Sequence, residues 1–293
     1  MKKVLVTGAT GFLGRHLIRH LNRQTQLSVI TTSIEPTEQA QTYDWIASTH
    51  YIPANLYIDR TDWYDFFECP DILVHLAWQG LPHYKEDFHF TTNLYKDYHF
   101  IKQLVLAGLQ DVTIAGTCFE YGMQEGCLNE NVCPKPDNPY AIAKDTLRRM
   151  LEMLVKQHPF HFKWTRLFYM YGEGQNSNAI LSQLKKAIDN KDEIFNMSGG
   201  EQLRDYQPVE DMAYNIMAIA LQNEVTGIIN NCSGRGTKVI DLVNDFILRE
   251  NVTISFHKGY YPYPDFEPFA FWGDNTKLTA AKKAYAQANE INR

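Results

Sequence analysis

The sequence predicts an α/β fold, in which a doubly wound parallel sheet carries a smaller, mixed α/β C-terminal lobe. Three observations support this prediction. Short apolar runs alternate with amphipathic helical patterns from residue 2 onward. Each run is apolar throughout, as in strands that are buried on both faces. The first run ends in a glycine-rich turn that leads directly into a helix.

The predicted elements follow one another in this alternating order. The expected strands lie at 4–6, 27–33, 51–56, 72–77, 111–115, 164–169, 202–206 and 227–231. The expected helices lie at 13–21, 93–106, 140–154 and 180–188, from 209, at 240–248, and from 276. Ligands of such sheets bind beyond the C-terminal ends of the strands, so the residues after each strand are the candidates for a site.

The turn after the first strand has the pattern Gly8-Ala9-Thr10-Gly11-Phe12-Leu13-Gly14. Glycine has no side chain, so the backbone at this turn can approach a pyrophosphate closely. The helix that follows directs unpaired N–H groups and the positive end of its dipole at the anion. We expect this Rossmann-type turn to bind a dinucleotide through Gly8, Thr10, Gly11, Phe12, Leu13 and Gly14. A packing turn without a ligand is the alternative interpretation.

The end of the second predicted strand bears on the choice between NAD and NADP. NAD sites usually place an acidic residue there, which binds the ribose 2′-hydroxyl. This sequence has Thr32 and Ser33, whose small hydroxyls leave room for a 2′-phosphate and can donate to it. The sequence thus favours NADP, and NAD is the alternative if Glu35 folds back onto the ribose. Further cofactor contacts are expected after the third and fourth strands, at Asn55, Leu56, Leu76, Ala77 and Trp78.

Composition and charge exclude several classes of protein. The formal net charge of -6 argues against a nucleic-acid partner. The five cysteines are scattered and form no CxxC pair, so neither a disulfide framework nor a metal site is predicted. No signal peptide and no apolar run of membrane-spanning length are found, and we therefore expect a cytoplasmic protein with no membrane partner.

Further motifs follow the glycine turn in a fixed order. They are Thr117 before Tyr121-Gly122, Tyr140-x-x-x-Lys144, Arg166-Leu167-Phe168 before Tyr171-Gly172, and Arg204-Asp205-Tyr206 before Val209-x-Asp211. With Gly8-x-x-Gly11-x-x-Gly14, the set resembles the extended short-chain dehydrogenase/reductase family, in the NAD-dependent epimerase/dehydratase branch that modifies nucleotide sugars. The resemblance covers essentially the whole chain and implies an NAD(P)-dependent oxidoreductase.

The resemblance also implies a domain division. It predicts a dinucleotide-binding Rossmann domain at 1–171, to which 205–250 partly returns. A smaller substrate-binding lobe would comprise 172–204 and 251–293. The resemblance further implies a homodimer that forms through the helices at 93–106 and 140–154.

Tyr140 and Lys144 are four residues apart on a predicted helix, so they share one face. Hydride transfer to a carbonyl creates an alkoxide that needs a proton. A free tyrosine has a pKa of about 10, and an ammonium one turn away would lower it. The resemblance implies that Tyr140 is the acid, that Lys144 tunes it and binds the nicotinamide ribose, and that Thr117 hydrogen-bonds the carbonyl. An ordinary exposed helix pair is the alternative interpretation.

The residues after Thr117 narrow the reaction. The family's 4,6-dehydratases have Asp-Glu there, where this sequence has Cys118 and Phe119, so dehydration is not expected. The related GDP-fucose synthases have a reactive cysteine at the place of Phe119, so epimerisation at carbons 3 and 5 is not expected either. Two reactions remain. They are NAD(P)H-dependent reduction of the 4-keto group of a nucleotide-linked 4-keto-6-deoxyhexose, and 4-epimerisation with tightly bound NAD.

The hydroxyls at Thr32 and Ser33 favour the reductase, because an epimerase recycles its NAD. We expect a dTDP-linked sugar of deoxysugar and surface-polysaccharide biosynthesis, since the aromatic loops suit a deoxygenated hexose. A non-catalytic binding protein of the same fold is a second alternative, against which the intact motif residues argue.

Substrate contacts are predicted beside the motifs. The residues are Gln79, His83, Thr117, Cys118, Phe119, Tyr169, Asn178 and Arg204. Arg204 is assigned to the diphosphate, because a guanidinium matches phosphate oxygens, with a surface ion pair as the alternative. The family usually has asparagine where Tyr169 stands, and Asn176 or Asn178 would compensate.

Overall fold

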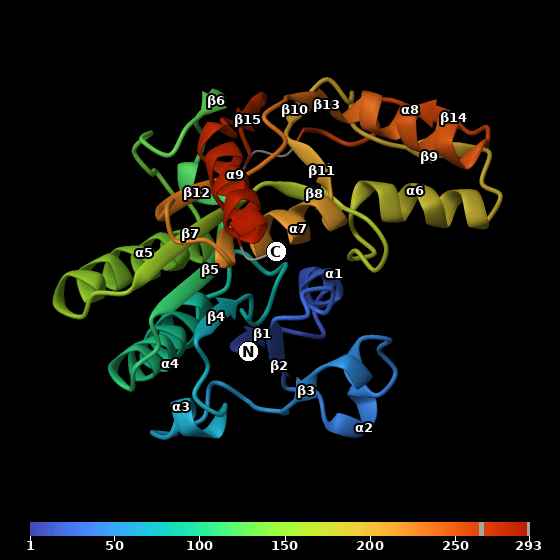
Figure 1. Cartoon of the computed structure of the whole chain (residues 1–293). Helices are drawn as coiled ribbons and strands as arrows, with labels where there is room; N and C mark the ends of the chain where they lie inside the picture. Colours follow the sequence, from blue (N-terminus) through green and yellow to red (C-terminus); the bar gives the residue numbers. More distant parts are fainter. Residues whose placement is uncertain (264–266, 292–293) are drawn as a thin grey trace.

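The computed structural model describes residues 1–263 and 267–291 (Figure 1). Within these residues the main sheet has seven strands, all parallel to their neighbours. The order is β12 (Gly227–Asn231), β7 (His161–Leu167), β5 (Asp111–Thr117), β4 (Ile72–His75), β1 (Lys2–Thr7), β2 (Leu27–Thr32) and β3 (His50–Tyr51). The predicted doubly wound Rossmann-type fold is confirmed.

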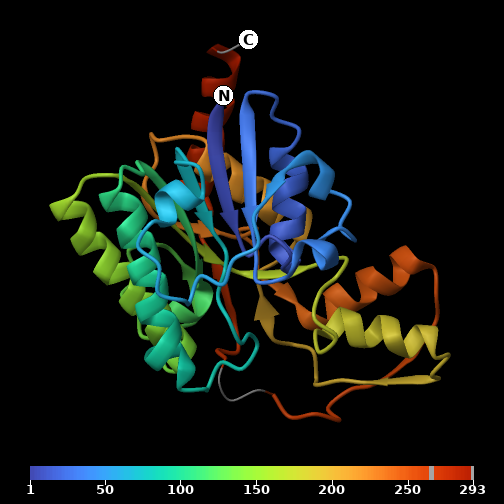
Figure 2. The same ribbon diagram turned by 90° about the horizontal axis from the view of Figure 1, so that it is seen from below.

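Helices cover both faces of this sheet (Figures 1 and 2). One face packs on α4 (Leu94–Leu106) and α5 (Pro139–Gln157), the other on α1 (Phe12–Leu21), α7 (Val209–Ala220) and α9 (Thr276–Ile291). Successive strand residues supply the two cores in turn: Leu5 and Leu73 pack under α4 and α5, whereas Val4 and Val6 pack under α1 and α7. This period of two explains why each strand is apolar throughout.

Short helical segments occupy several connections. They are α2 (Thr37–Ala40), η1 (Ile46–Ser48), α3 (Trp63–Phe66), the π-helix η2 (His89–Asn93) and the 3-10 helix η3 (Cys118–Tyr121). The third strand is shorter than the predicted 51–56, because the chain after Tyr51 runs into Pro53, which has no N–H for a ladder.

A smaller lobe projects to one side of the sheet (Figure 1). It contains α6 (Ile180–Asp189), α8 (Val239–Glu250) and the paired strands β9 (Ile194–Asn196) and β14 (Ser255–His257). These elements share an apolar core that includes Leu184, Phe195 and Val243. Three more strand pairs connect the lobe to the sheet: β8 (Tyr169–Tyr171) with β11 (Tyr206–Pro208), β10 (Leu203–Arg204) with β13 (Thr237–Lys238), and β6 (Gly126–Leu128) with β15 (Phe271–Gly273).

The predicted domain division stays a prediction, and two helices make contacts that differ from it. The α8 helix lies within 205–250 but packs on α6 and β9 in the lobe. The α9 helix lies within 251–293 but packs on α7 and β12 at the main sheet. By its contacts, α8 therefore belongs to the lobe, whose apolar core is assembled around α6, and α9 belongs to the main sheet.

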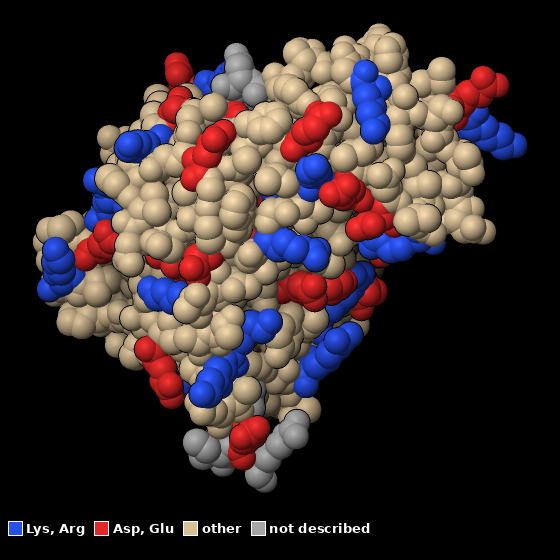
Figure 3. Space-filling view, turned by 90° about the horizontal axis from the view of Figure 1, so that it is seen from above, with Lys and Arg blue, Asp and Glu red and all other residues tan. Residues whose placement is uncertain are grey.

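The surface seen in Figure 3 carries acidic and basic side chains side by side. Such an arrangement gives this face no extended basic stripe of the kind that binds a phosphate backbone. Across the described ranges, no helix combines the length and the apolar character needed to cross a bilayer.

The glycine turn lies where the sheet topology reverses. The chain leaves β1 at Gly8, with β4 on one side and β2 on the other. Gly8 has a φ of +70°, and a Cβ there would lie 2.9 Å from the amide nitrogen of Ala77. A Cβ at Gly14 would lie 2.2 Å from the carbonyl oxygen of Gly8. Both positions therefore require glycine, which lets α1 begin directly against the end of the strand.

A buried carboxylate fixes the end of β5. Glu120 Oε1 accepts hydrogen bonds from the backbone N–H of Thr117 at 3.0 Å and from Trp164 Nε1 at 2.8 Å. Its Oε2 accepts from Arg166 Nε at 2.8 Å, and both charged side chains are fully buried. Thr117 Oγ1 in turn accepts from the N–H of Phe119, which completes a capping box. The proton of the Thr117 hydroxyl is thus left free to donate.

We predict that Glu120→Gln lowers the free energy of unfolding by about 3–5 kcal/mol, because it leaves the Arg166 guanidinium buried without a counter-charge. Urea unfolding followed by circular dichroism measures this. The matched control is Glu152→Gln, whose carboxylate also meets a buried arginine, Arg148, at 2.6 Å, but whose side chain is 40% exposed. It should cost less than about 1 kcal/mol. Equal losses in the two variants would contradict the assignment.

Candidate active site

Three of the predicted residues meet at the C-terminal edge of the sheet. Thr117 ends β5, and Tyr140 and Lys144 lie on the first turns of α5. This helix begins where predicted, because Asn138 Oδ1 accepts from the N–H of Ala141 at 3.0 Å and Pro139 occupies its first turn. All three predicted side chains are buried, so the alternative of an exposed helix pair does not hold.

Tyr140 is surrounded by aromatic rings. The ring centroids of Tyr84 and His89 lie 5.4 Å from its own, and that of Trp78 lies 6.0 Å away. Burial is the main influence on the phenol and raises the pKa of Tyr140, which a hydrogen bond with Thr117 partly opposes. Tyr140 is therefore held as the neutral phenol, the form that can give up a proton.

The net pKa of Tyr140 is thus raised rather than lowered, because burial outweighs the expected influence of Lys144. The Lys144 ammonium lies over the ring of Trp78, with Nζ 4.2 Å from the centroid. Burial also lowers the pKa of Lys144 to about 8, and the negative charges of Asp97 and Glu120 oppose that shift. Helical spacing placed these residues on one face of α5, but it contained no information on how strongly the surroundings exclude water.

Two groups of predicted cofactor residues, the glycine turn and Leu76-Ala77, lie together at the ends of β1 and β4. The hydroxyl of Thr7 accepts from the backbone N–H groups of Leu76 and Ala77, each at 3.2 Å, so the turn before Trp78 is tied to β1. The first turn of α1 begins at Gly11 without a side-chain cap, so its N–H groups are open to an anion. Thr10, Phe12 and Leu13 are half-buried around this turn. The close backbone packing at Gly8 and Gly14 lets the turn stay tight, and the uncapped N–H groups of α1 suit a pyrophosphate.

The end of β2 does not provide what NADP requires. Thr32 is fully buried together with its hydroxyl. Ser33 Oγ accepts from the N–H of Glu35 and is 2.7 Å from the hydroxyl of Tyr51, which itself donates to the carbonyl oxygen of Glu35 at 2.5 Å. The Ser33 proton is therefore used on Tyr51. Neither predicted hydroxyl is left to donate to a 2′-phosphate, so the basis of the NADP expectation is wrong.

The two cofactor contacts predicted after the third strand, Asn55 and Leu56, differ in their burial. Asn55 is exposed, and its Oδ1 accepts from the N–H of Tyr57 at 3.0 Å. Leu56 is 7% exposed and packs into the core under α4. The side chain of Leu56 is thus a core residue rather than a ligand contact, which corrects that prediction.

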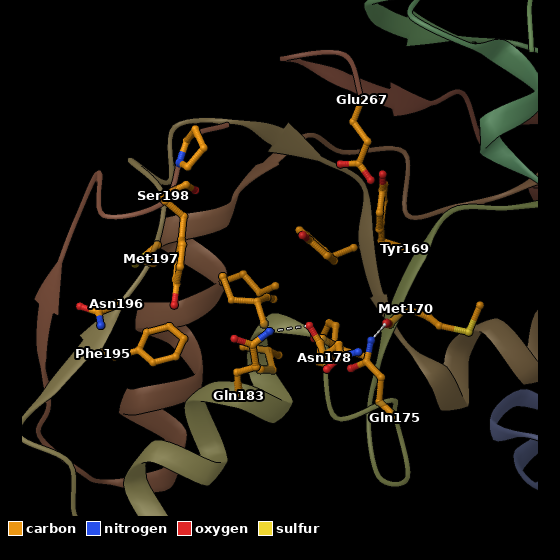
Figure 4. Close-up of a pocket in the computed structure, with 18 residues that line it drawn as sticks. Tyr169, Met170, Gln175, Asn178, Gln183, Phe195, Asn196, Met197, Ser198 and Glu267 are labelled. Atoms are coloured by element: carbon orange, nitrogen blue, oxygen red, sulfur yellow. Dashed lines mark hydrogen bonds between the residues drawn. The ribbon is translucent and has the colours of Figure 1, made fainter. Parts of the chain in front are cut away.

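A pocket of about 470 Å³ opens between β8, α6 and β9 (Figure 4). Tyr169 and Asn178, both predicted substrate contacts, line it, and Asn178 also accepts from Gln183 Nε2 at 2.7 Å. Phe119 connects this pocket to the buried phenol, since its ring lies 6.3 Å from Tyr169 and 5.2 Å from Tyr84. A row of rings therefore runs from Tyr140 to the pocket.

The prediction for Arg204 is corrected. Its Nε and Nη2 donate to Glu267 Oε2 at 3.2 and 3.0 Å, and its Nη1 donates to the carbonyl oxygens of Leu203 and Phe269. The side chain is only 3% exposed, so its donors face the protein rather than a diphosphate. Glu267, which the sequence did not reveal as a partner, lines the same pocket beside Tyr169 (Figure 4).

Phe119 and Tyr169 are half-buried, whereas three other predicted substrate contacts are either buried or exposed. Cys118 is buried among Phe168 and Cys232, and burial raises the pKa of its thiol, so it is a core residue. Gln79 and His83 have exposed side chains. Their carbonyl oxygens accept from Asn93 Nδ2 and His89 Nε2, both at 2.9 Å, so the polar residues of η2 hold this loop.

Sequence reasoning missed His89, Glu120 and Glu267. The pattern Thr117-x-x-Glu120 is a capping-box signature and could have revealed the second of these. No comparable local signal points to His89 or Glu267, whose partners come from other segments of the chain.

Comparison with known proteins agrees with this geometry. Residues 4–232 match the NAD dependent epimerase/dehydratase family. The dTDP-6-deoxy-L-talose 4-dehydrogenase (NAD(+)) of Aggregatibacter actinomycetemcomitans is 27% identical over 273 residues, which span 92% of this chain and 98% of that protein. The GDP-6-deoxy-D-talose 4-dehydrogenase of the same organism is 26% identical over 250 residues, 82% of this chain and 77% of that one.

Solved structures share the fold over the whole length. The UDP-glucuronic acid 4-epimerase of Bacillus cereus, in complex with UDP-glucuronic acid and NAD, superposes with a TM-score of 0.81 at 20% identity and covers 99% of both chains. The fold, the ordered motifs and the family match agree, and the family predicted from the motifs is confirmed. The chain is an enzyme that belongs to the NAD dependent epimerase/dehydratase family.

Proposed function

We propose that this enzyme uses NADH to reduce the 4-keto group of a dTDP-linked 4-keto-6-deoxyhexose. The observation that carries the proposal is the buried, neutral phenol of Tyr140 beside Thr117, at the edge of the sheet that holds the glycine turn. Support also comes from a relative named for 4-dehydrogenation of a dTDP-linked 6-deoxysugar, matched over 98% of its length.

The chemistry assigns one task to each of the three side chains. NADH, when bound at the glycine turn, supplies the hydride that forms the new C–H bond at carbon 4. The hydroxyl of Thr117, whose oxygen accepts from the N–H of Phe119, donates its proton in a hydrogen bond to the carbonyl oxygen. Tyr140 gives its phenolic proton to this oxygen, which becomes the product hydroxyl. The ammonium of Lys144, one turn away, stabilises the phenolate left behind.

The proposal takes NAD rather than NADP as the cofactor. The hydroxyl of Ser33 is occupied by Tyr51, and that of Thr32 is buried out of reach of a 2′-phosphate. The carboxylate of Glu35 lies close enough to the hydroxyls of Tyr43 and Tyr51 to raise the pKa of each, although burial is the larger cause. A negative charge in this place favours a free ribose hydroxyl over a phosphate.

The substrate side supports a deoxygenated sugar. The rings of Phe119, Tyr84 and Tyr169 line the way from Tyr140 to the pocket, and such rings suit a 6-methyl group better than a hydroxymethyl group. We place the nucleotide in the pocket beside α6.

Two further features are part of the proposal. Large apolar side chains are exposed on α4 and α5: Tyr95, Leu106, Ile142 and Met153. They support a homodimer formed through these helices. We also propose that the enzyme is cytoplasmic and that it acts in the biosynthesis of surface polysaccharide.

We predict that Tyr140→Phe lowers kcat by about 10²–10⁴-fold, because the alkoxide loses its proton donor. The loss of NADH absorbance with a dTDP-4-keto-6-deoxyhexose measures the rate. The control is Tyr95→Phe, which removes a hydroxyl from a side chain 56% exposed on α4 and should leave the rate unchanged. A Tyr140→Phe enzyme with full activity would contradict the proposed acid.

For the cofactor, we predict that KM for NADPH exceeds that for NADH by about tenfold or more, because the 2′-phosphate loses its water without gaining a donor. Initial rates with the two cofactors at fixed sugar concentration give the ratio. A lower KM for NADPH would show that the end of β2 rearranges.

The alternative is a 4-epimerase with tightly bound NAD, which would use the same three residues. We predict that one NADH is consumed for each sugar reduced. The sugar product is analysed by NMR after incubation with and without added NADH. Interconversion of two dTDP-hexoses that differ at carbon 4, with NAD co-purifying and no NADH consumed, would instead establish the epimerase.

A further inference from the structure

The Lys144 ammonium is held in an unusual way for a buried charge. Its side chain is 2% exposed, and within the described ranges its Nζ makes neither a hydrogen bond nor an ion pair. Its close neighbours are ring faces: the centroid of Trp78 lies 4.2 Å from Nζ and that of Trp164 lies 5.5 Å away. Both distances are within the range of a cation–π interaction. The N–H groups of Lys144 thus stay free.

The two indoles are fixed by different partners. Trp164 is fully buried, and its Nε1 donates to the carboxylate of Glu120 at 2.8 Å. Trp78 lies in a loop, is only half-buried, and its Nε1 donates to His89 Nδ1 at 2.9 Å. The orientation of Trp78 therefore depends on its hydrogen bond with His89. Trp164, by contrast, is fixed inside the core.

His89 is fitted to this task by its own contacts. An indole nitrogen can only donate, so Nδ1 of His89 must be an acceptor. The proton of the ring is then on Nε2, which donates to the carbonyl oxygen of His83 at 2.9 Å. His89 is completely buried, and burial lowers its pKa. The ring is thus held neutral, as one tautomer.

We propose that Trp78 is a positioning residue that holds the Lys144 ammonium against its ring face, and that His89 fixes the indole in that place. The kinetic part of this proposal rests on the proposed function, whereas the part that concerns the charge of Lys144 does not. Neither Trp78 nor His89 takes a proton from the substrate in this scheme. Both act through Lys144.

The groups around Lys144 determine what the loss of Trp78 does. Asp97 of α4 and Glu120 of η3 favour the charged form, whereas burial opposes it and leaves the pKa of Lys144 at about 8. His89 faces it as a neutral ring, and Tyr140 as a neutral phenol. Lys144 is charged below its pKa and neutral above it. Removing an attractive ring face therefore moves the loss of charge to lower pH, by about one pH unit.

The test is a titration that needs no substrate. Lysine labelled with ¹³C at Cε is followed by NMR against pH, and Lys144→Arg identifies the Lys144 signal. Trp78→Leu should shift the midpoint down by about one unit, and Trp78→Phe, which keeps a weaker ring face, by less. His89→Leu should resemble Trp78→Phe, whereas His89→Gln, whose amide can accept from Trp78 and donate to His83, should keep the wild-type midpoint.

Trp272→Leu is the matched control, because this tryptophan lies on β15 and should leave the midpoint in place. A Trp78→Leu protein that folds but titrates like the wild type would overturn the proposal. If that variant does not fold, unchanged midpoints in both Trp78→Phe and His89→Leu would overturn it equally. In the kinetic arm, the alkaline limb of kcat should move with the NMR midpoint. An inactive wild type would count against the proposed function alone.

Discussion

The buried carboxylate of Glu120 is the interaction on which the geometry of the active site depends. Its two oxygens accept hydrogen bonds from the backbone N–H of Thr117, the indole of Trp164 and the guanidinium of Arg166. It thereby connects the end of β5 with β7, and it fixes both the end of the strand that carries Thr117 and one of the rings beside Lys144. A charge in this place is tolerated because every oxygen has a partner and Arg166 balances it.

Exclusion of water then determines the protonation of the site. Burial keeps Tyr140 neutral and weakens the charge of Lys144, while it makes the thiol of Cys118 inert. The same influence thus keeps the phenol of Tyr140 and the thiol of Cys118 protonated on either side of Thr117. The aromatic side chains of Trp78, Tyr84 and His89, all from the connection between β4 and α4, surround the phenol and contribute to this burial.

Much of the fold could be predicted from local patterns. The strands follow from apolar runs, and Gly8 and Gly14 mark a turn that no larger residue could form. Thr117, Tyr140 and Lys144 could be proposed as candidates because their motifs are local. Contacts between distant segments could not be predicted from the sequence. Arg204 pairs with Glu267, 63 residues away, and the hydroxyl of Ser33 donates to that of Tyr51. Motif spacing indicates candidate residues, but only the tertiary structure shows which hydrogen-bond donors are already occupied.

The pairing of Arg204 with Glu267 has a consequence for recognition. A carboxylate and a phosphate present similar oxygens to a guanidinium, so an incoming anion at this pocket competes with a ligand that the chain itself supplies. If the nucleotide binds where we propose, its affinity is the difference between two pairings, one of them intramolecular. A ligand that lacks a strong anion would gain nothing from displacing Glu267.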